Sequence, residues 1–209
     1  MKRFFPREAK VRRLPVGLAR GLRMHIDFSR HTGLYLGLYE MELNRALRRL
    51  VRPGRPCLDV GGAYGYDALV LAKLCRADVV SFEADPELCE IIRVNAAANA
   101  ELGTLISVEC GFVGDGPGEI ALDDYVDLAP GFVKIDIEGA EAAALRAGRE
   151  LFTRVRPTAI VETHSALLED ECAWLLDKMG YRTTIVNPRR WLVELRPAEH
   201  NRWLLAEPR

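Results

Sequence analysis

Residues 57–65 read Cys-Leu-Asp-Val-Gly-Gly-Ala-Tyr-Gly, and this stretch indicates the fold class. Its first four residues predict a short buried strand, and its glycines predict a tight turn into a helix over residues 66–75. Glycines at such a turn let the backbone approach a ligand and leave the first N–H groups of the helix open. The spacing is not Gly-x-Gly-x-x-Gly and no Lys-Ser or Lys-Thr pair follows, so it favours neither a dinucleotide fingerprint nor a P-loop.

Short apolar runs and helix-like segments alternate along the rest of the chain. We expect strands at residues 78–83, 105–109, 132–136, 158–162 and 181–186, with further β-like runs at 191–195 and 203–205. We expect helices at residues 34–51, 85–102, 140–152 and 169–179. This alternation predicts a Rossmann-like, doubly wound α/β fold with helices on both faces of a mostly parallel seven-stranded sheet with an antiparallel edge. Ligands of such sheets bind at the carboxyl ends of the strands.

Charge is unevenly distributed along the 209 residues, although the formal net charge is only −1. Residues 1–56 hold 14 Lys and Arg against 4 Asp and Glu, whereas the remainder holds 15 against 26. We therefore divide the chain into a basic arm, residues 1–33, and one domain, residues 34–209. Three interpretations of residues 1–23 remain open: a solvated extension that packs its few apolar residues on the body, a contact with an anionic membrane, or an RNA-binding arm.

The five cysteines are scattered and odd in number, and none forms a Cys-x-x-Cys pair. This pattern argues against a disulfide framework or a zinc site and favours a reducing compartment. The N-terminus lacks the apolar core of a signal peptide, and no apolar run approaches the roughly 20 residues that span a bilayer. We expect a cytoplasmic protein.

Acidic residues stand at the ends of the first two expected strands. Asp59 precedes the glycines Gly61, Gly62 and Gly65, and a carboxylate there suits a cationic ligand such as S-adenosylmethionine better than a pyrophosphate. Glu83 lies 18 residues after Gly65, close to the roughly 20-residue interval at which an acid meets ribose hydroxyls. Together these positions predict a nucleoside-binding site, although each alone is also typical of a turn or a solvated loop.

A second group of polar residues follows the strands expected at 132–136 and 158–162. Asp136, Glu138 and Glu141 lie within six residues of one another, and Glu162 and His164 end the next strand. A histidine at this edge could act as a general base, or could be structural. Carboxylates and an imidazole could also hold a divalent cation, but the spacing is not diagnostic and we predict no metal.

In this order, these blocks resemble the FkbM-type methyltransferases, a family of class I S-adenosylmethionine-dependent enzymes. The matching blocks are residues 37–40, 58–66, 82–86, 122–125, 133–141 and 160–164, so the resemblance covers about residues 33–187. The most specific block is Lys-Ile-Asp-Ile-Glu-Gly-Ala-Glu at residues 134–141. The chain departs from the family where Ala63 replaces an expected asparagine, where residues 110–113 replace an alanine-rich turn near the adenine, and in a short segment after Val113.

The resemblance implies a role for each candidate residue. Asp59, Gly61 and Gly65, with Gly62 beside them, would bind the methionine part of the cofactor, and Glu83 its ribose. Asp136 and Glu138 would face the transfer site, and Glu40, Glu162 and His164 would line the acceptor pocket. The family methylates hydroxyl groups of sugars, polyketides and related metabolites.

The sequence therefore predicts O-methylation of a small acceptor, with His164 as base and Asp136 or Glu138 orienting the acceptor. A nucleic-acid methyltransferase that uses the basic arm is the alternative, although no Asn-Pro-Pro-Tyr-like motif follows the strand at 132–136. A catalytically silent cofactor-binding protein is a second alternative, and an NAD-dependent oxidoreductase is disfavoured by the glycine spacing. The sequence indicates no oligomeric state.

Overall fold

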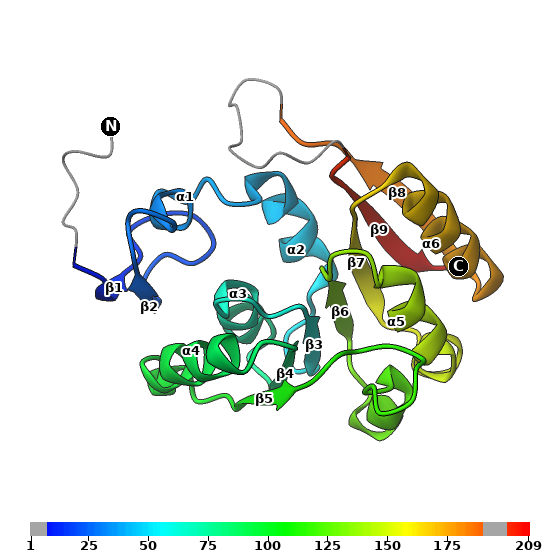
Figure 1. Cartoon of the computed structure of the whole chain (residues 1–209), viewed down its shortest axis with the longest axis horizontal. Coiled ribbons are helices and arrows are strands. Elements are labelled where there is room, and N and C mark those ends of the chain that lie inside the picture. Colours follow the sequence, from blue (N-terminus) through cyan, green and yellow to red (C-terminus); the bar gives the residue numbers. More distant parts are fainter. Residues whose placement is uncertain (1–7, 190–199) are drawn as a thin grey trace.

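The computed structural model describes residues 8–189 and 200–209. A seven-stranded sheet runs through the molecule in the order β5-β4-β3-β6-β7-β9-β8 (Figure 1). The first five strands in this order are parallel, whereas β9 runs antiparallel to both β7 and β8. The strands are β3 (Cys57–Val60), β4 (Val79–Glu83), β5 (Ile106–Cys110), β6 (Phe132–Ile135), β7 (Thr158–Thr163), β8 (Tyr181–Val186) and β9 (Arg202–Pro208). The predicted fold class is confirmed.

The main helices begin where the sequence provides a cap or a turn. They are α2 (Asn44–Leu50), α3 (Tyr66–Cys75), α4 (Pro86–Ala97), α5 (Glu141–Ala147) and α6 (Ala166–Lys178). Asp85 caps α4 by accepting from the N–H of Glu87, and Pro86 occupies the first helical position. Ser165 caps α6 in the same way, accepting from the N–H of Leu168. The predicted strand at 57–60 and the predicted helix at 66–75 have the observed bounds.

The prediction of one continuous helix at residues 34–51 is wrong. The chain instead forms α1 (Thr32–Tyr35), a 3-10 turn (Met41–Leu43) and α2. Gly37 and Glu40 adopt positive φ angles of 66° and 40°, which interrupt a right-handed helix. The helices expected at 85–102 and 140–152 also end early, the second continuing as a single π-helical turn at Leu151–Val155. The β-like run at 191–195 lies outside the described residues.

Two hydrophobic clusters cover the two faces of the sheet. Apolar residues of α2 and α3 pack on one face with Cys57, Val79 and Phe132. Residues of α5 and α6 pack on the other face with Leu58, Val80 and Val133. Successive strand residues point to opposite faces, and burial on both sides explains why the strands read as nearly continuous apolar runs.

A row of buried polar residues crosses the face that α3 covers. Asp59 on β3 is the register partner of Ser81 on β4 and of Lys134 on β6, so the three side chains share one face. All three are at most 1% exposed. Polar side chains in such an interior must be paired, and this row lies one residue from the carboxyl ends of β3 and β6.

Residues 8–28 are more ordered than the basic composition of the arm suggests. A hairpin of β1 (Lys10–Arg13) and β2 (Arg23–Ile26) lies beside α4, far from β8 and β9 (Figure 1). Leu14, Met24 and Ile26 are at most 1% exposed and belong to the same hydrophobic cluster as α3. Alternating apolar side chains on β2, rather than net charge, place this segment on the body, as the first interpretation of the arm supposes.

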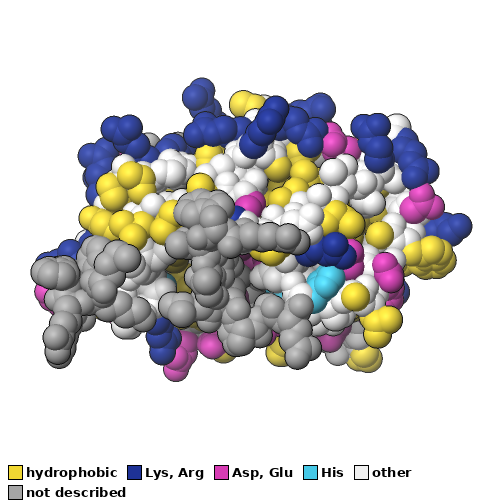
Figure 2. Space-filling view, turned by 90° about the horizontal axis from the view of Figure 1, so that it is seen from above, with side chains coloured by type: hydrophobic (Ala, Val, Ile, Leu, Met, Phe, Trp, Pro, Cys, Tyr) yellow, Lys and Arg dark blue, Asp and Glu magenta, His cyan; other side chains and the backbone are white. Residues whose placement is uncertain are grey.

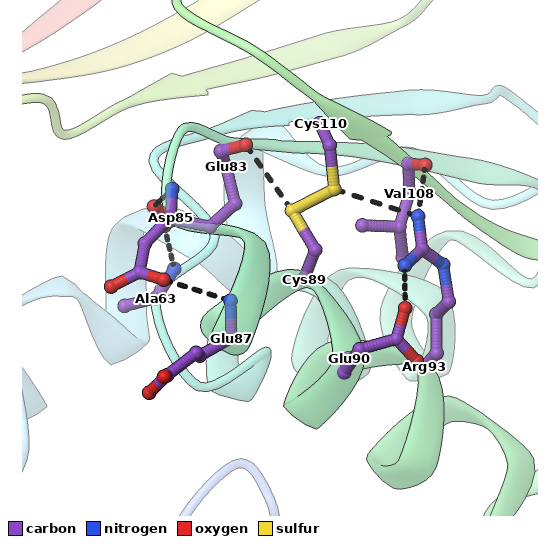
Figure 3. Close-up of a disulfide and its surroundings, with 9 residues drawn as sticks. All are labelled: Ala63, Glu83, Asp85, Glu87, Cys89, Glu90, Arg93, Val108 and Cys110. Carbon is purple, nitrogen blue, oxygen red and sulfur yellow. Dashed lines mark hydrogen bonds and ion pairs between the residues drawn. A yellow bond between two sulfur atoms is a disulfide. The ribbon is translucent and has the colours of Figure 1, made fainter.

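The cysteines contradict the expectation that no disulfide forms. Cys89 on α4 and Cys110 at the end of β5 are joined by a disulfide (Figure 3), while Cys57, Cys75 and Cys172 are free and buried. The pair is separated by 21 residues, and it is the crossover from α4 back to β5 that brings the two sulfur atoms together. Within the residues that the structure describes, no helix is long and apolar enough to cross a membrane.

Candidate functional site

A cavity of about 550 Å³ lies at the carboxyl ends of the parallel strands. Each central strand contributes a residue at or just after its end, and these include Gly61 after β3, Glu83 of β4, Gly111 after β5, Asp136 after β6 and His164 after β7. This is the edge at which the sequence predicted ligand binding. The volume lies in the range of about 300–1,000 Å³ that is usual for small-molecule and cofactor sites.

The turn from β3 into α3 lies against the cavity and leaves no room for a side chain. A Cβ added to Gly61 would stand 2.7 Å from the carbonyl carbon of Asp136, and one added to Gly62 would stand 2.7 Å from Ile92 Cδ1. Gly61 also adopts a φ of 95°, which favours glycine. The glycines therefore bring backbone close to the space between β3 and β6, where a ligand can meet it directly.

Glu83 is held in place by the neighbouring backbone (Figure 3). Its Oε2 accepts from the N–H of Ala63 at 2.7 Å and its Oε1 from the N–H of Asp85 at 2.9 Å. The carboxylate thus connects the glycine turn to the start of α4, and it lines the cavity. Each carboxylate oxygen has further lone-pair capacity, so Glu83 can accept from a pair of hydroxyls without losing these bonds.

The far end of the cavity is apolar. Leu88, Gly111, Phe112 and Val113 line it, and Phe112 is 71% exposed. The Cys89–Cys110 disulfide adjoins this end, because Cys89 Sγ lies 3.3 Å from the carbonyl oxygen of Glu83 and Cys110 directly precedes Gly111. An exposed aromatic ring beside a small residue suits a flat, apolar ligand group.

Asp136, Glu162 and His164 form a compact cluster on the opposite side. One potential ligand atom from each residue lies within 4.8 Å of the others. His164 Nε2 is 3.7 Å from Asp136 Oδ1 and 3.8 Å from Glu162 Oε1, and Glu162 Oε2 accepts from the indole N–H of Trp203 at 3.0 Å. Asp136 and His164 line the cavity, whereas Glu162 is buried behind them.

Glu141 orients His164 from the other side of the ring. Its Oε1 pairs with His164 Nδ1, and Glu141 is itself fully buried at the first turn of α5. The bond to Glu141 raises the pKa of His164 above its ordinary value, against the opposing effect of burial, and Asp136 adds to the rise. With Nδ1 occupied, Nε2 is the nitrogen that faces Asp136 and the cavity.

Lys134 lies beneath the cluster and is wholly buried. Its Nζ is 2.7 Å from Asp67 Oδ2, 3.1 Å from Asp136 Oδ2 and 3.1 Å from Glu40 Oε2. Burial alone would raise the pKa of Asp136, but the charge of Lys134, together with hydrogen bonds to Glu162 and Lys134, holds that pKa below its ordinary value. Asp136 is therefore ionised where it meets the cavity.

Two carboxyl groups of this interior are less easily ionised. Burial raises the pKa of Glu40 well above its usual range, despite the neighbouring Lys134. Burial, with the nearby charge of Asp67, raises the pKa of Asp59 to about 7, and Asp59 Oδ2 accepts from Ser81 Oγ at 2.8 Å. Both residues are buried, and neither is among the residues that line the cavity.

The structure therefore distributes the sequence-predicted residues over three positions. Gly61, Glu83, Asp136, Glu138 and His164 line the cavity, with Glu138 exposed at its mouth. Gly62 lines a neighbouring cavity of about 270 Å³ that shares Tyr39, Gly61 and Ala63 with the first. The other four are among the lining of neither cavity: Gly65 begins α3, and Asp59, Glu40 and Glu162 are buried.

Sequence reasoning missed the partners that set the charge and orientation of these residues. They are Lys134, Asp67, Glu141 as the partner of His164, and Trp203 as the partner of Glu162. One signal was available for Lys134, since a lysine inside the apolar strand Phe132–Ile135 requires a buried counter-charge.

Comparisons with known proteins agree with this geometry. Residues 115–183 match the family model described as methyltransferase FkbM domain, and no curated protein matches the chain. Among solved structures, methyltransferase FkbM from Methylobacillus flagellatus is 19% identical with a TM-score of 0.58, covering 87% of this chain and 56% of its own. A precorrin-6y C5,15-methyltransferase from Geobacter metallireducens is 17% identical with a TM-score of 0.60, covering 82% and 89%.

A third similar structure is a SAM-dependent O-methyltransferase from Thermotoga maritima, 13% identical with a TM-score of 0.60, covering 81% of this chain and 65% of its own. At these identities the three structures establish the fold alone. The match over residues 115–183 includes the Lys-Ile-Asp-Ile-Glu-Gly-Ala-Glu block, the most specific block of the resemblance, and the block that contains Glu162 and His164. The motifs, the family match and the fold agree: residues 115–183 are similar to the methyltransferase FkbM domain, which supports a methyltransferase that uses S-adenosylmethionine as its cofactor.

Proposed function

We propose that the protein methylates a hydroxyl group of a small metabolite, of the sugar or polyketide type. The observation that carries the proposal is the cluster of Asp136, Glu162 and His164 at the end of a cofactor-sized cavity. A hydroxyl acceptor must lose a proton on methylation, and this cluster offers an imidazole nitrogen flanked by two carboxylates to receive it.

The residues that line the cavity fit the cofactor chemically. Glu83 would accept from the ribose hydroxyls, Phe112 and Val113 would pack on the adenine, and the backbone of Gly61 would meet the methionine part. The ionised Asp136 complements a cationic ligand. When bound, S-adenosylmethionine supplies an electrophilic methyl group on a sulfonium centre.

His164 would take up the acceptor proton at Nε2. Glu141 fixes the ring through Nδ1 and stabilises the imidazolium once the proton has arrived. Because the same bond raises the pKa of His164, the residue holds a proton at neutral pH more readily than a free histidine does. A cationic cofactor nearby lowers that pKa again and restores the base. Glu138, exposed at the mouth, would orient the acceptor.

The neighbouring cavity of about 270 Å³ supports a small acceptor. Arg30, His31 and Tyr64 line it, and it meets the cofactor cavity at Tyr39, Gly61 and Ala63. Arg30 Nη1 donates to Tyr64 Oη at 3.3 Å, so a cation and a phenol stand together at its wall. A polyhydroxylated molecule would find hydrogen-bonding groups there. Glu40 does not line this cavity, so it would not touch the acceptor. Its contribution would be indirect, through its contact with Lys134.

Calorimetry with S-adenosylhomocysteine tests the cofactor part of the proposal. We expect Glu83→Ala to weaken binding about tenfold or more, because two charge-assisted hydrogen bonds are lost. Glu87→Ala is the matched control, since Glu87 is exposed in the first turn of α4, four residues after Glu83, and is not among the residues that line the cavity. Binding of NAD in place of S-adenosylhomocysteine would overturn the proposal.

Turnover tests the acceptor part. Labelled cofactor is incubated with a small-molecule extract and, separately, with total RNA, and the labelled product is identified by its mass. We expect label on a small hydroxylated compound, and loss of that label with His164→Ala while S-adenosylhomocysteine still binds. Label on RNA alone would support the nucleic-acid alternative, and binding without label on either would support a silent cofactor-binding protein. Activity undiminished by a chelator would contradict a metal-assisted reaction at Asp136, Glu162 and His164.

A further inference from the structure

A third cavity, at the opposite ends of the parallel strands, has no part in the proposed methyl transfer. It encloses about 310 Å³ at the starts of β6 and β7 and the end of β9. Arg52, Arg55 and Arg156 line it, with Pro130, Pro157 and Pro208 among the walls, and we name it the arginine pocket. Gly131 in its wall is five residues before Asp136, so roughly 16 Å of extended chain separates the two sites.

The charge of the arginine pocket is not neutralised by its own walls. Among the residues of the described chain that line it, none is Asp or Glu. Arg55 donates to the carbonyl oxygen of Ala129 at 2.9 Å, and Arg156 donates to the carbonyl oxygen of Gly180 at 3.4 Å and to a carboxylate oxygen of the last residue, Arg209, at 3.1 Å. The side chain of Arg52 makes no hydrogen bond or ion pair with the residues that the structure describes. A carbonyl fixes a guanidinium but leaves its positive charge in place.

Two of the three guanidinium groups are positioned before any ligand arrives. The stem of Arg55 lies across Gly131, where an added Cβ would stand 2.6 Å from Arg55 Cβ. Arg156 stacks over the ring of Tyr181, with its Cζ 6.0 Å from the ring centroid. Each guanidinium has five N–H donors, so most of them remain available beside the cavity. Groups already ordered in this way lose little side-chain entropy when they bind a ligand.

We infer that the arginine pocket binds the phosphate group of a phosphorylated ligand. Guanidinium groups recognise phosphate and carboxylate through paired N–H donors. A carboxylate offers two oxygens and a single charge, whereas a phosphate monoester offers three oxygens and up to two charges. The second suits three arginines, of which Arg52 and Arg55 come from the loop before β3 and Arg156 from the loop before β7. Thr158, whose hydroxyl lies 3.2 Å from the carbonyl oxygen of Gly131, adds a polar group to the same wall.

The phosphate could belong to a free metabolite or to a lipid headgroup. The basic side chains around the pocket help to distinguish these two sources. The adjoining helix α2 carries the exposed Arg45 and Arg48, while its Arg49 is paired with Glu207. Lys and Arg side chains also gather along one border of the molecule seen from above (Figure 2). A flat basic surface beside the pocket would favour a headgroup, whereas the pocket alone is enough for a free phosphate.

The test measures binding of pyrophosphate by calorimetry and of phosphatidic acid vesicles by flotation, with neutral vesicles as reference, at about 50 mM salt where screening is weak. We expect arginine-dependent binding in at least one arm, weakened about tenfold by Arg52→Ala and further by Arg52→Ala combined with Arg156→Ala. Binding of pyrophosphate identifies a free phosphate ligand, and binding of the acidic vesicles alone identifies a headgroup.

Arg154→Ala is the matched control, because Arg154 is exposed two residues away and pairs with Glu150 instead of lining the pocket. S-adenosylhomocysteine binding reports that each variant is folded, and it should be unchanged in all of them. Absence of binding in both arms would overturn the inference, as would equal binding by the wild type and the double variant. Neither result bears on the proposed methyl transfer, since these residues lie at the opposite ends of the parallel strands.

Discussion

Replacement of Lys134 by methionine tests the buried charge cluster beneath the site. The variant keeps most of the side-chain volume but removes the ammonium that lies within 3.1 Å of carboxylate oxygens of Glu40, Asp67 and Asp136. Removing one partner from a buried ion pair typically costs about 3–5 kcal/mol, because the remaining charges stay desolvated. We expect Lys134→Met to lose about that much free energy of unfolding at pH 8.

The loss of unfolding free energy in Lys134→Met should be larger at high pH than at low pH. Without Lys134, burial and repulsion from neighbouring carboxylates raise the folded-state pKa of Asp136 above its unfolded value near 4 and raise that of Glu40 further. Stability contributed by groups with raised pKa values is present at low pH and is lost as pH rises through the folded pKa. The variant should therefore recover part of the lost stability between pH 8 and pH 5.5.

Urea unfolding, followed by tryptophan fluorescence at both pH values, measures these differences. With a slope of about 2 kcal/mol/M, the expected loss at pH 8 moves the midpoint down by about 2 M. Lys178→Met is the control, because Lys178 is exposed on α6 and its ammonium only stacks over Trp174. A loss below about 1 kcal/mol at pH 8, or an equal loss at both pH values, would refute the reasoning.

Three further predictions concern other parts of the site. Glu141→Gln should lower the pKa of His164, so the acidic limb of the rate–pH profile should move to lower pH. An acidic limb at the same pH in the variant would show that Glu141 does not raise the pKa of His164. Ala63→Gly should raise the free energy of unfolding by about 1 kcal/mol, because Ala63 has a φ of 45°, and a lower melting temperature would show that its methyl group is needed. Cys89→Ser should cost about 3 kcal/mol in oxidising buffer by releasing the loop closed with Cys110, and an unfolding midpoint insensitive to reductant in the wild type would contradict the disulfide.

Local sequence patterns were enough to predict the central strands and the edge at which the cavity lies. The glycine turn after residues 57–60 and the acid at Glu83 carry their own local signals, since glycine permits positive φ and an acid after a strand lies at the sheet edge. The prediction of one helix at residues 34–51 was wrong because apolar periodicity does not reveal a left-handed residue such as Glu40, whose carboxyl group contacts the distant Lys134.

The partners within the site could not be predicted because they depend on tertiary proximity. Glu141 and His164 are 23 residues apart and meet only because β6 and β7 are neighbours in the sheet. Likewise, the cysteines at 89 and 110 carry no spacing signal, and their pairing follows from the packing of α4 on β5. Charge composition was a poor guide to residues 8–28, because a few buried apolar side chains outweigh many exposed arginines in deciding whether a segment packs.

Glu40 limits how far the wall of the proposed acceptor cavity could be exchanged for that of another protein. Part of that wall comes from the chain before α2, whereas the ammonium that faces Glu40 belongs to β6. A graft that ends before Tyr39 keeps the contact between Glu40 and Lys134, whereas one that replaces Glu40 leaves Lys134 with Asp67 and Asp136 as its remaining acidic partners. An exchange of this wall should therefore end at residue 38, and the residues from Tyr39 onward should be kept.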